Sequence, residues 1–170
     1  MRKIILFIAS SLDVYIARKN GNIDWLFTDA DYGYAKFYRL IDAVLMGRKT
    51  YAQAKEVEEY PFKGKKAYVF TKDNNLKKDK NVEFVNDVVG FSKKLIKSSG
   101  KNIWLVGGGE IVSIFLNNNL LDEIVLSIHP ILLGKGIPLF NNIQKETKFE
   151  MVRIKKFKSG LLQTHYNITR

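Results

Sequence analysis

The sequence predicts an α/β protein built as a three-layer sandwich, in which helices flank a mixed, mostly parallel sheet and an antiparallel hairpin closes the chain. Three observations lead to this fold class. Short apolar runs, typical of buried strands, alternate along the chain with segments of helical spacing. Two of these runs end in glycine just before a helical segment, as strands of a parallel sheet often do. The last two predicted strands flank Ser159-Gly160, which indicates a hairpin.

The first predicted element is a strand over residues 4–9. This apolar run follows two cations and so superficially resembles a signal peptide, but it is short, and Asp13 and Arg18 come soon after it. A buried strand is the better interpretation. No apolar run in the sequence approaches the roughly 20 residues needed to cross a bilayer. We therefore expect a cytoplasmic protein without a membrane segment.

The elements that follow alternate in type. Residues 31–41 place Tyr34, Phe37, Tyr38 and Ile41 at helical spacing, which predicts a helix, and the apolar run 43–46 before Gly47 predicts a strand. By the same criteria, further strands are predicted at 66–70, 82–85, 103–106 and 123–128, and further helices at 50–57, 88–96 and 111–116. The hairpin strands are predicted at 148–157 and 161–169.

Length and composition bound the possible functions. The 170 residues include 28 Lys and Arg against 17 Asp and Glu, and 46% of them are hydrophobic. These values fit one domain over residues 1–170 with a core large enough to fold without cross-links. The absence of cysteine excludes disulfides and thiolate metal sites, and the two histidines lie too far apart in sequence to suggest a metal motif. We expect no metal. The net charge of +11 fits nucleic acid or a small phosphorylated ligand, but solvated loop and strand faces explain most of the lysines better, so the charge alone does not decide the function.

A run of glycines follows one of the predicted strands. Gly107, Gly108 and Gly109 come directly after it, and Glu110 and Ile111 open the next helix. Residues without side chains let backbone N–H groups approach an anion at the positive end of a helix. The alternative is a tight turn that needs positive φ. The sequence leaves both interpretations open.

Two more predicted strands end in residues suited to phosphate. Gly47, Arg48, Lys49 and Thr50 follow one strand, and Thr71 and Lys72 follow the next. The planar guanidinium of Arg48 can bind a phosphate through two hydrogen bonds. Because the carboxyl ends of parallel strands share one edge of a sheet, these residues and the glycine run would meet there. A ligand with several phosphates, such as a dinucleotide, would fit all three strand ends.

Five segments together resemble the dihydrofolate reductase superfamily, in particular the branch related to the reductase domain of riboflavin biosynthesis. They are residues 11–17, 24–26, 45–51, 106–110 and 129–140, and they occur in the family's order over nearly the whole chain. The resemblance implies a dihydrofolate-reductase-like fold that binds NADPH. It implies that Arg48, Thr71 and Lys72 surround the adenosine 2′-phosphate. The other implied cofactor residues are Ala9, Ile16, Ala17, Gly47, Lys49, Thr50, Gly107, Gly108, Gly109, Glu110 and Ile111.

The resemblance also implies a substrate side of the site. It places Asp31 where folate reductases hold an acid that anchors the pterin, with Trp25 and Ser127 nearby as substrate-binding residues. Asp31 is therefore the first candidate for the catalytic acid and Asp13 the second. The alternatives are that Asp31 caps the helix after it and that Asp13 shapes a turn.

The sequence departs from the family pattern at two positions near this site. Val14 stands where the riboflavin branch usually has glycine, so the turn after Asp13 could differ from the family's. Lys65 stands where folate reductases use an arginine to bind the glutamate of folate. A lysine keeps the charge but lacks the two-pronged guanidinium, which disfavours folate.

We therefore expect an NADPH-dependent reductase that transfers a hydride to a small heterocyclic or imine-like substrate. The alternatives are 5-amino-6-(5-phosphoribosylamino)uracil reductase of riboflavin biosynthesis, dihydrofolate reductase and, from another class, a non-catalytic basic nucleic-acid-binding domain. The last is disfavoured because it leaves the glycine run unexplained. We also expect a homodimer, since the resemblance implies pairing through the later strands and residues 124–140 are rich in apolar side chains. These side chains could instead pack beneath the final hairpin.

Overall fold

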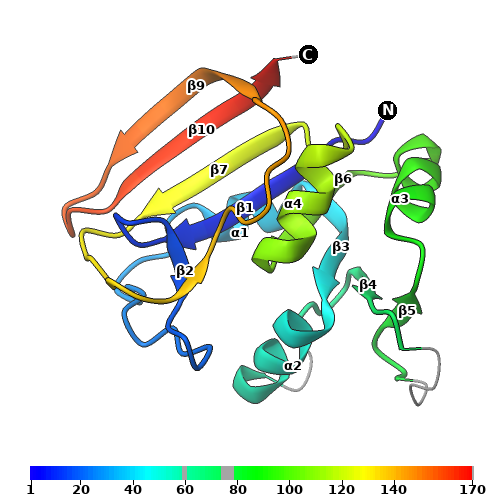
Figure 1. The fold of residues 1–170 in the computed structure, drawn as a ribbon, viewed down its shortest axis with the longest axis horizontal. Coiled ribbons are helices and arrows are strands. Elements are labelled where there is room, and N and C mark those ends of the chain that lie inside the picture. The colour runs from blue at the N-terminus through cyan, green and yellow to red at the C-terminus, as the bar shows by residue number, and fades with distance from the viewer. Residues whose placement is uncertain (59–60, 74–78, 170) are drawn as a thin grey trace.

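The structure is a computed structural model that describes residues 1–58, 61–73 and 79–169. The elements in chain order are β1 (Ile4–Ser10), β2 (Tyr15–Ala17), α1 (Tyr34–Arg39), β3 (Ile41–Gly47), α2 (Arg48–Val57), β4 (Lys66–Phe70), β5 (Glu83–Val85), α3 (Val88–Lys97), β6 (Asn102–Gly107), α4 (Gly109–Asn117), β7 (Glu123–Ile128), β8 (Ile137–Pro138), β9 (Lys148–Lys156) and β10 (Leu162–Thr169) (Figure 1). Every strand and helix expected from the sequence is present.

The main sheet has eight strands in the order β5-β4-β3-β6-β1-β7-β10-β9. Neighbours from β5 to β7 pair in parallel, and β10 and β9 continue the sheet as an antiparallel hairpin. The near-continuous apolar runs of β1, β3 and β6 suit this arrangement, because strands in the middle of a parallel sheet are buried on both faces. The prediction of a mixed, mostly parallel sheet with a closing hairpin is confirmed.

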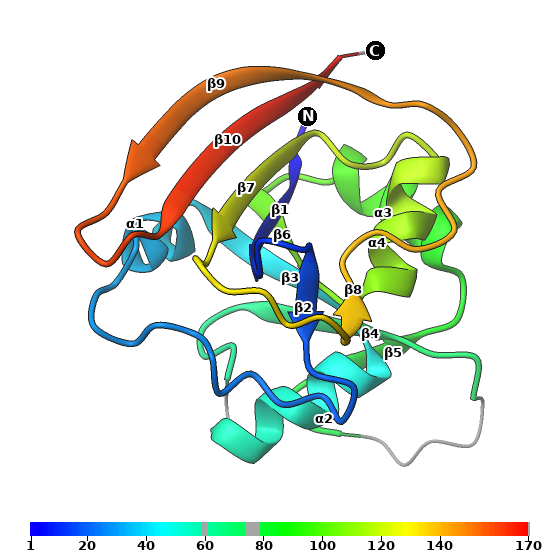
Figure 2. The ribbon, with the colours of Figure 1, turned by 60° about the vertical axis from the view of Figure 1, so that its left-hand side comes forward.

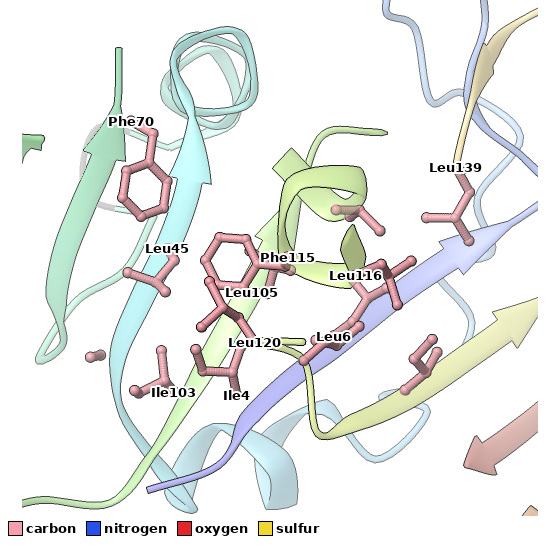
Figure 3. Packing of buried hydrophobic residues seen from close by; sticks show 14 of the residues in the cluster. Ile4, Leu6, Leu45, Phe70, Ile103, Leu105, Phe115, Leu116, Leu120 and Leu139 are labelled. Carbon is pink, nitrogen blue, oxygen red and sulfur yellow. The ribbon is translucent and has the colours of Figure 1, made fainter. Parts of the chain in front are cut away.

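Helices cover both faces of the sheet, which confirms the three layers. On one face, side chains of α3 and α4 pack on β1, β3, β4 and β6 around Phe115 and Leu105. Figure 3 shows this cluster, to which Leu139, the residue directly after β8, also belongs. On the other face, Phe37 of α1 and Tyr51 of α2 pack against Val44. Among the residues that the structure describes, no helix is long and apolar enough to span a membrane.

β1 supplies the core on both sides of the sheet. Its side chains alternate, so that Ile4 and Leu6 enter the cluster with α3 and α4, while Ile5 enters the cluster with α1 and α2. Ile4 and Leu6 are fully buried. Burying one such side chain contributes about 1.5–3 kcal/mol to the free energy of unfolding, so this strand alone secures a large part of the core.

Two parts of the structure differ from the expectation. β2 and β8 pair with each other in a separate two-stranded sheet (Figure 2), and strands of three and two residues are too short to show a period in the sequence. The helix expected over residues 31–41 is shorter, since α1 begins at Tyr34. Tyr32 and Gly33 have φ of 50° and 84°, and a right-handed helix cannot include such residues.

β9 is the last strand of the sheet, and all nine of its residues are exposed. Four of them are large and apolar, with exposed fractions of 40–53%, namely Phe149, Met151, Val152 and Ile154. The register with β10 skips Val152, which forms a bulge. Bulges and lysines are common devices against unwanted pairing at a sheet edge, and β9 has lysines at both ends.

Candidate cofactor and substrate site

The carboxyl ends of β3, β4 and β6 meet at one edge of the sheet. β3 lies between the other two strands, with Gly47 opposite Phe70 of β4 and Met46 opposite Gly107 of β6. All three strands are parallel, so the segments that follow them leave the sheet side by side (Figure 1). The expected phosphate-binding residues of the three strand ends therefore lie together, as the sequence indicated.

The turns after β3 and β6 touch each other directly. The backbone N–H of Gly108 donates to Oγ1 of Thr50 at 3.0 Å. A Cβ at Gly47 would lie 3.2 Å from Cγ1 of Ile111, and a Cβ at Gly108 would lie 3.3 Å from the Thr50 hydroxyl. Neither α2 nor α4 has a side-chain hydrogen bond at its N-cap. The two helices thus direct uncapped N-termini toward this edge, where they favour an anion.

Glycine is present for a different structural reason at each of the three positions 107, 108 and 109. Gly107 has φ of 131°, which side chains rarely adopt. A Cβ at Gly109 would lie 2.4 Å from the carbonyl oxygen of Pro138 and 3.3 Å from that of Leu139. Gly109 is therefore required by the close approach of β8 to α4. The tight-turn interpretation fits Gly107, close packing explains Gly109, and Gly108 is the one that faces the β3 turn.

A carboxylate lies among the cations at the ends of β3 and β4. Nη1 of Arg48 is 3.1 Å from Oδ2 of Asp73 in an exposed ion pair. The backbone N–H of Asp73 donates to Oγ1 of Thr71 at 3.1 Å. Lys49 and Lys72 are exposed beside them in sequence. The cations were predicted from the sequence, whereas Asp73, two residues after Thr71, was not.

The residues expected at the nicotinamide lie around the end of β1. Ala9 pairs in register with Ser127 of β7. β2 contacts β1, and in it Ala17 is buried while Ile16 packs on the edge of the core. The chain passes so close here that a Cβ at Gly136 would lie 2.4 Å from the carbonyl oxygen of Ala17.

Asp13 is fully engaged in hydrogen bonds. It accepts from the Ser11 hydroxyl at 2.6 Å and from the backbone N–H groups of Leu133 and Gly134 at 3.1 and 2.7 Å. The Ser11 hydroxyl is the largest cause that holds the pKa of Asp13 below its ordinary value. The carboxylate joins the turn after β1 to the loop before β8, which favours the turn-shaping role over proton donation. Val14, next in the chain, adopts φ of 63°, the conformation in which glycine is preferred.

Asp31 is exposed and lies before α1. Its two carboxylate oxygens accept from the N–H of Ala35 at 3.0 and 3.3 Å, so it caps the first turn although Gly33 occupies the N-cap position. Ser127 is linked to this segment indirectly. Nε2 of the buried Gln163 donates to Oγ of Ser127 and to the carbonyl oxygen of Tyr32, both at 3.0 Å. Gln163 was not identified from the sequence, because a glutamine in a strand carries no signal of such a role.

Trp25 lies buried beside His129. Their rings meet edge to face with centroids 5.1 Å apart. Nε2 of His129 accepts from the N–H of Phe27 at 3.2 Å, which puts the ring proton on Nδ1, 3.3 Å from the carbonyl oxygen of Ser127. Burial lowers the pKa of His129. The histidine is therefore neutral and fixes the segment that carries Trp25, which is a hydrogen-bonded role and not a catalytic one.

Two residues at this end of the sheet each carry a polar atom that has no hydrogen-bond partner in the described part of the chain. These atoms are Nε1 of Trp25 and Oγ of Ser10, and both are buried. Buried polar groups are nearly always paired, so each exception calls for an explanation. A polar ligand beside the end of β1 would supply the missing partners.

Comparison with known proteins decides the family of this fold and site. Residues 2–163 match the family model described as the RibD C-terminal domain. The chain belongs to the RibD C-terminal domain family. This family is the riboflavin-reductase-like branch of the dihydrofolate-reductase-like superfamily, and its members are NAD(P)H-dependent reductases. The resemblance inferred from the five sequence segments is confirmed.

Individual members and solved structures agree with this assignment. The uncharacterized protein YwjB of Bacillus subtilis (strain 168) is 39% identical over 97% of this chain and 97% of its own length. A putative riboflavin biosynthesis protein from Shewanella sp. PV-4 superposes with a TM-score of 0.83 at 29% identity, over 99% of both chains. A diaminohydroxyphosphoribosylaminopyrimidine deaminase/5-amino-6-(5-phosphoribosylamino)uracil reductase from Thermotoga maritima shares the fold, with a TM-score of 0.77 at 18% identity. That match covers 99% of this chain and 57% of the other.

In this member of the RibD C-terminal domain family, Lys65 is directed into the protein. Its Nζ donates to the carbonyl oxygen of Ile41 at 2.8 Å and lies 4.4 Å from the centroid of the Tyr38 ring. Burial lowers the pKa of Lys65. The ammonium group thus binds a carbonyl oxygen at the start of β3 and contacts a ring of α1. It does not point toward a site where it could bind the carboxylate of a ligand.

Proposed function

We propose that this chain is an NADPH-dependent reductase that transfers a hydride to a small heterocyclic or imine-like substrate. The observation that carries the proposal is the direct contact between the turns after β3 and β6, in which Thr50 accepts from the N–H of Gly108 beside two uncapped helix N-termini. This contact places backbone N–H groups, glycines and the Arg48 guanidinium at one edge of the sheet, as a ligand with several phosphates requires.

Different residues of the chain would bind different parts of the cofactor. Arg48, Thr71 and Lys72 would bind the 2′-phosphate, and the N-termini of α2 and α4 would bind the pyrophosphate. Ala9, Ile16 and Ala17 would border the nicotinamide and exclude water from it. When bound, NADPH supplies the hydride. The fit is supported at the N-termini of α2 and α4, where no side chain caps the backbone N–H groups.

The substrate would lie beside Trp25 and Ser127. Nε1 of Trp25 is buried without a hydrogen-bond partner in the described residues, and an acceptor on the polar edge of the substrate would bind it. Asp31 stays the first candidate for the group that holds the proton of the reaction, because Asp13 is already engaged by three donors. For this role the Asp31 carboxylate would release the N–H of Ala35 and turn toward the substrate.

Two observations bear on the substrate class. The inward direction of Lys65 argues against folate, because the cation expected to bind the glutamate of folate is bonded to a backbone carbonyl instead. 5-Amino-6-(5-phosphoribosylamino)uracil reductase is the second candidate function. It is favoured by the likeness to the putative riboflavin biosynthesis protein from Shewanella sp. PV-4 over 99% of both chains.

We also propose that the chain forms a homodimer. The segment 124–140 supports this less than the sequence suggested, since Ile124 and Leu139 are buried in the core while Leu132 and Phe140 are exposed. Stronger support comes from β9, whose exposed apolar side chains lie on the last strand of the sheet. Light scattering at micromolar concentration should give the mass of two chains, and a monomer would refute the proposal.

A binding experiment tests the reductase proposal before any substrate is known. Calorimetric titration of the purified chain should show NADPH binding, and Arg48→Ala should weaken it by about 1.5–3 kcal/mol, the contribution of a charge-assisted hydrogen bond. Addition of dihydrofolate or of the riboflavin intermediate to the NADPH complex would then show which one oxidises the cofactor. Binding of duplex DNA without any binding of NADPH would refute the proposal in favour of the nucleic-acid alternative.

A further inference from the structure

The ion pair at the ends of β3 and β4 brings an acid into a cluster of cations. Arg48 is the first residue of α2, and its guanidinium lies 3.1 Å from the Asp73 carboxylate. Lys49 and Lys72 are adjacent in sequence to the two partners. In a site meant only for a phosphate dianion, a carboxylate at this position is unfavourable because like charges repel.

The backbone holds Asp73 in this place. The N–H of Thr71 donates to the carbonyl oxygen of Val85 at 3.0 Å, which fixes the end of β4 against β5. The Thr71 hydroxyl then accepts from the N–H of Asp73, which turns the chain back toward Arg48. Two hydrogen bonds thus hold the backbone that carries Asp73, and the carboxylate itself is held by the ion pair with Arg48.

The two forms of the nicotinamide cofactor would meet this carboxylate differently. A 2′-phosphate that binds the Arg48 guanidinium competes with Asp73 for Nη1 or, at the other N–H groups, carries its charge close to the carboxylate. A ribose 2′-hydroxyl can donate a hydrogen bond to a carboxylate. Acidic residues favour NADH in this way in other dinucleotide-binding sites. The three cations still outnumber the acid, so the cluster keeps an attraction for phosphate.

We infer that Asp73 is a specificity-determining residue that lowers the preference of this chain for NADPH over NADH. The inference rests on the proposed function, because it concerns the same cofactor site. The wild-type chain should therefore bind both cofactors. Its affinity for NADPH should exceed its affinity for NADH by a smaller factor than Arg48, Thr71 and Lys72 alone would give.

The test compares Asp73→Asn with a control that changes the net charge equally. Glu150→Gln is that control, because Glu150 is exposed on β9, at the opposite end of the sheet from β4. Calorimetric titration of both variants and the wild type with NADPH and NADH gives the ratio of the two affinities. Adenosine 2′,5′-bisphosphate and AMP serve as second probes, since they differ in the 2′-phosphate and lack the nicotinamide. Both exchanged side chains are exposed, so the variants should fold.

Asp73→Asn should tighten the binding of NADPH and of the bisphosphate by roughly 2- to 5-fold, the size expected for an exposed charge beside the ligand, and leave the binding of NADH and AMP unchanged or slightly weaker. Glu150→Gln should leave all four affinities unchanged. An unchanged NADPH-to-NADH ratio in Asp73→Asn, or an equal change in Glu150→Gln, would overturn the inference and leave the proposed function intact. A wild-type chain that binds neither dinucleotide would instead overturn the proposed function.

Discussion

Replacing Gly109 by alanine should destabilise the protein through one backbone contact. The new Cβ would lie 2.4 Å from the Pro138 carbonyl oxygen, so β8 or α4 must move by about 1 Å to reach ordinary contact. Overpacking of this kind costs about 1–3 kcal/mol. Alanine also restricts the unfolded chain, which returns about 0.4–1 kcal/mol. The free energy of unfolding should therefore fall by about 1–2 kcal/mol, which lowers Tm by about 2–8 °C in a chain of this size.

Urea unfolding followed by circular dichroism measures this difference. Gly108→Ala is the matched control, because its Cβ would lie 3.3 Å from the Thr50 hydroxyl, so a shift of a few tenths of an ångström is enough to accommodate it. The control should change the free energy of unfolding by less than about 1 kcal/mol. If Gly109→Ala proves as stable as the wild type, the packing of β8 does not require glycine at the start of α4. The reasoning from close approach would then be refuted.

Three further predictions concern single side chains. Asp31→Asn should leave stability and NADPH affinity nearly unchanged and reduce turnover of the true substrate by roughly 100-fold or more, and wild-type turnover would remove Asp31 from the reaction. Val14→Gly should raise the free energy of unfolding by up to about 1 kcal/mol in urea titrations, because valine at positive φ is strained. Burial acts to raise the pKa of Glu123, but hydrogen bonds from Lys3 and His165 outweigh it and hold that pKa below 4.5. The stability that Glu123 contributes is therefore present above about pH 4.5 and lost as pH falls further, so Glu123→Gln should flatten the fall in stability between about pH 5 and pH 3.

Most of the fold could be predicted because its strands are buried on both faces. Such strands have continuous apolar runs in the sequence, and turn residues separate the runs of β1, β3 and β6 from one another. The prediction failed at the bounds of α1, because the expected range of 31–41 included Tyr32 and Gly33, whose backbone is left-handed. Side-chain spacing reports which residues share a face and does not report φ.

The site was predicted unevenly for a similar reason. Residue types at strand ends located the cofactor edge, because parallel strands bring their carboxyl ends together whatever lies between them in sequence. The sequence could not separate Gly108 from Gly109, since the difference depends on how close β8 approaches. Asp73 and Gln163 act through partners on other elements, and nothing local distinguishes them from ordinary surface or strand residues.

The position of β1 has a consequence for how the chain acquires its structure. Ile4 pairs in register with Ile103 of β6, and Ile5 pairs with Glu123 of β7, so β1 finds its neighbours only after about a hundred more residues have been made. Closing such long loops costs entropy before any pairing compensates for it. During synthesis the apolar β1 therefore waits unpaired, exposed to other nascent chains and to chaperones. We expect slow, late folding, in which assembly of the centre of the sheet limits the rate.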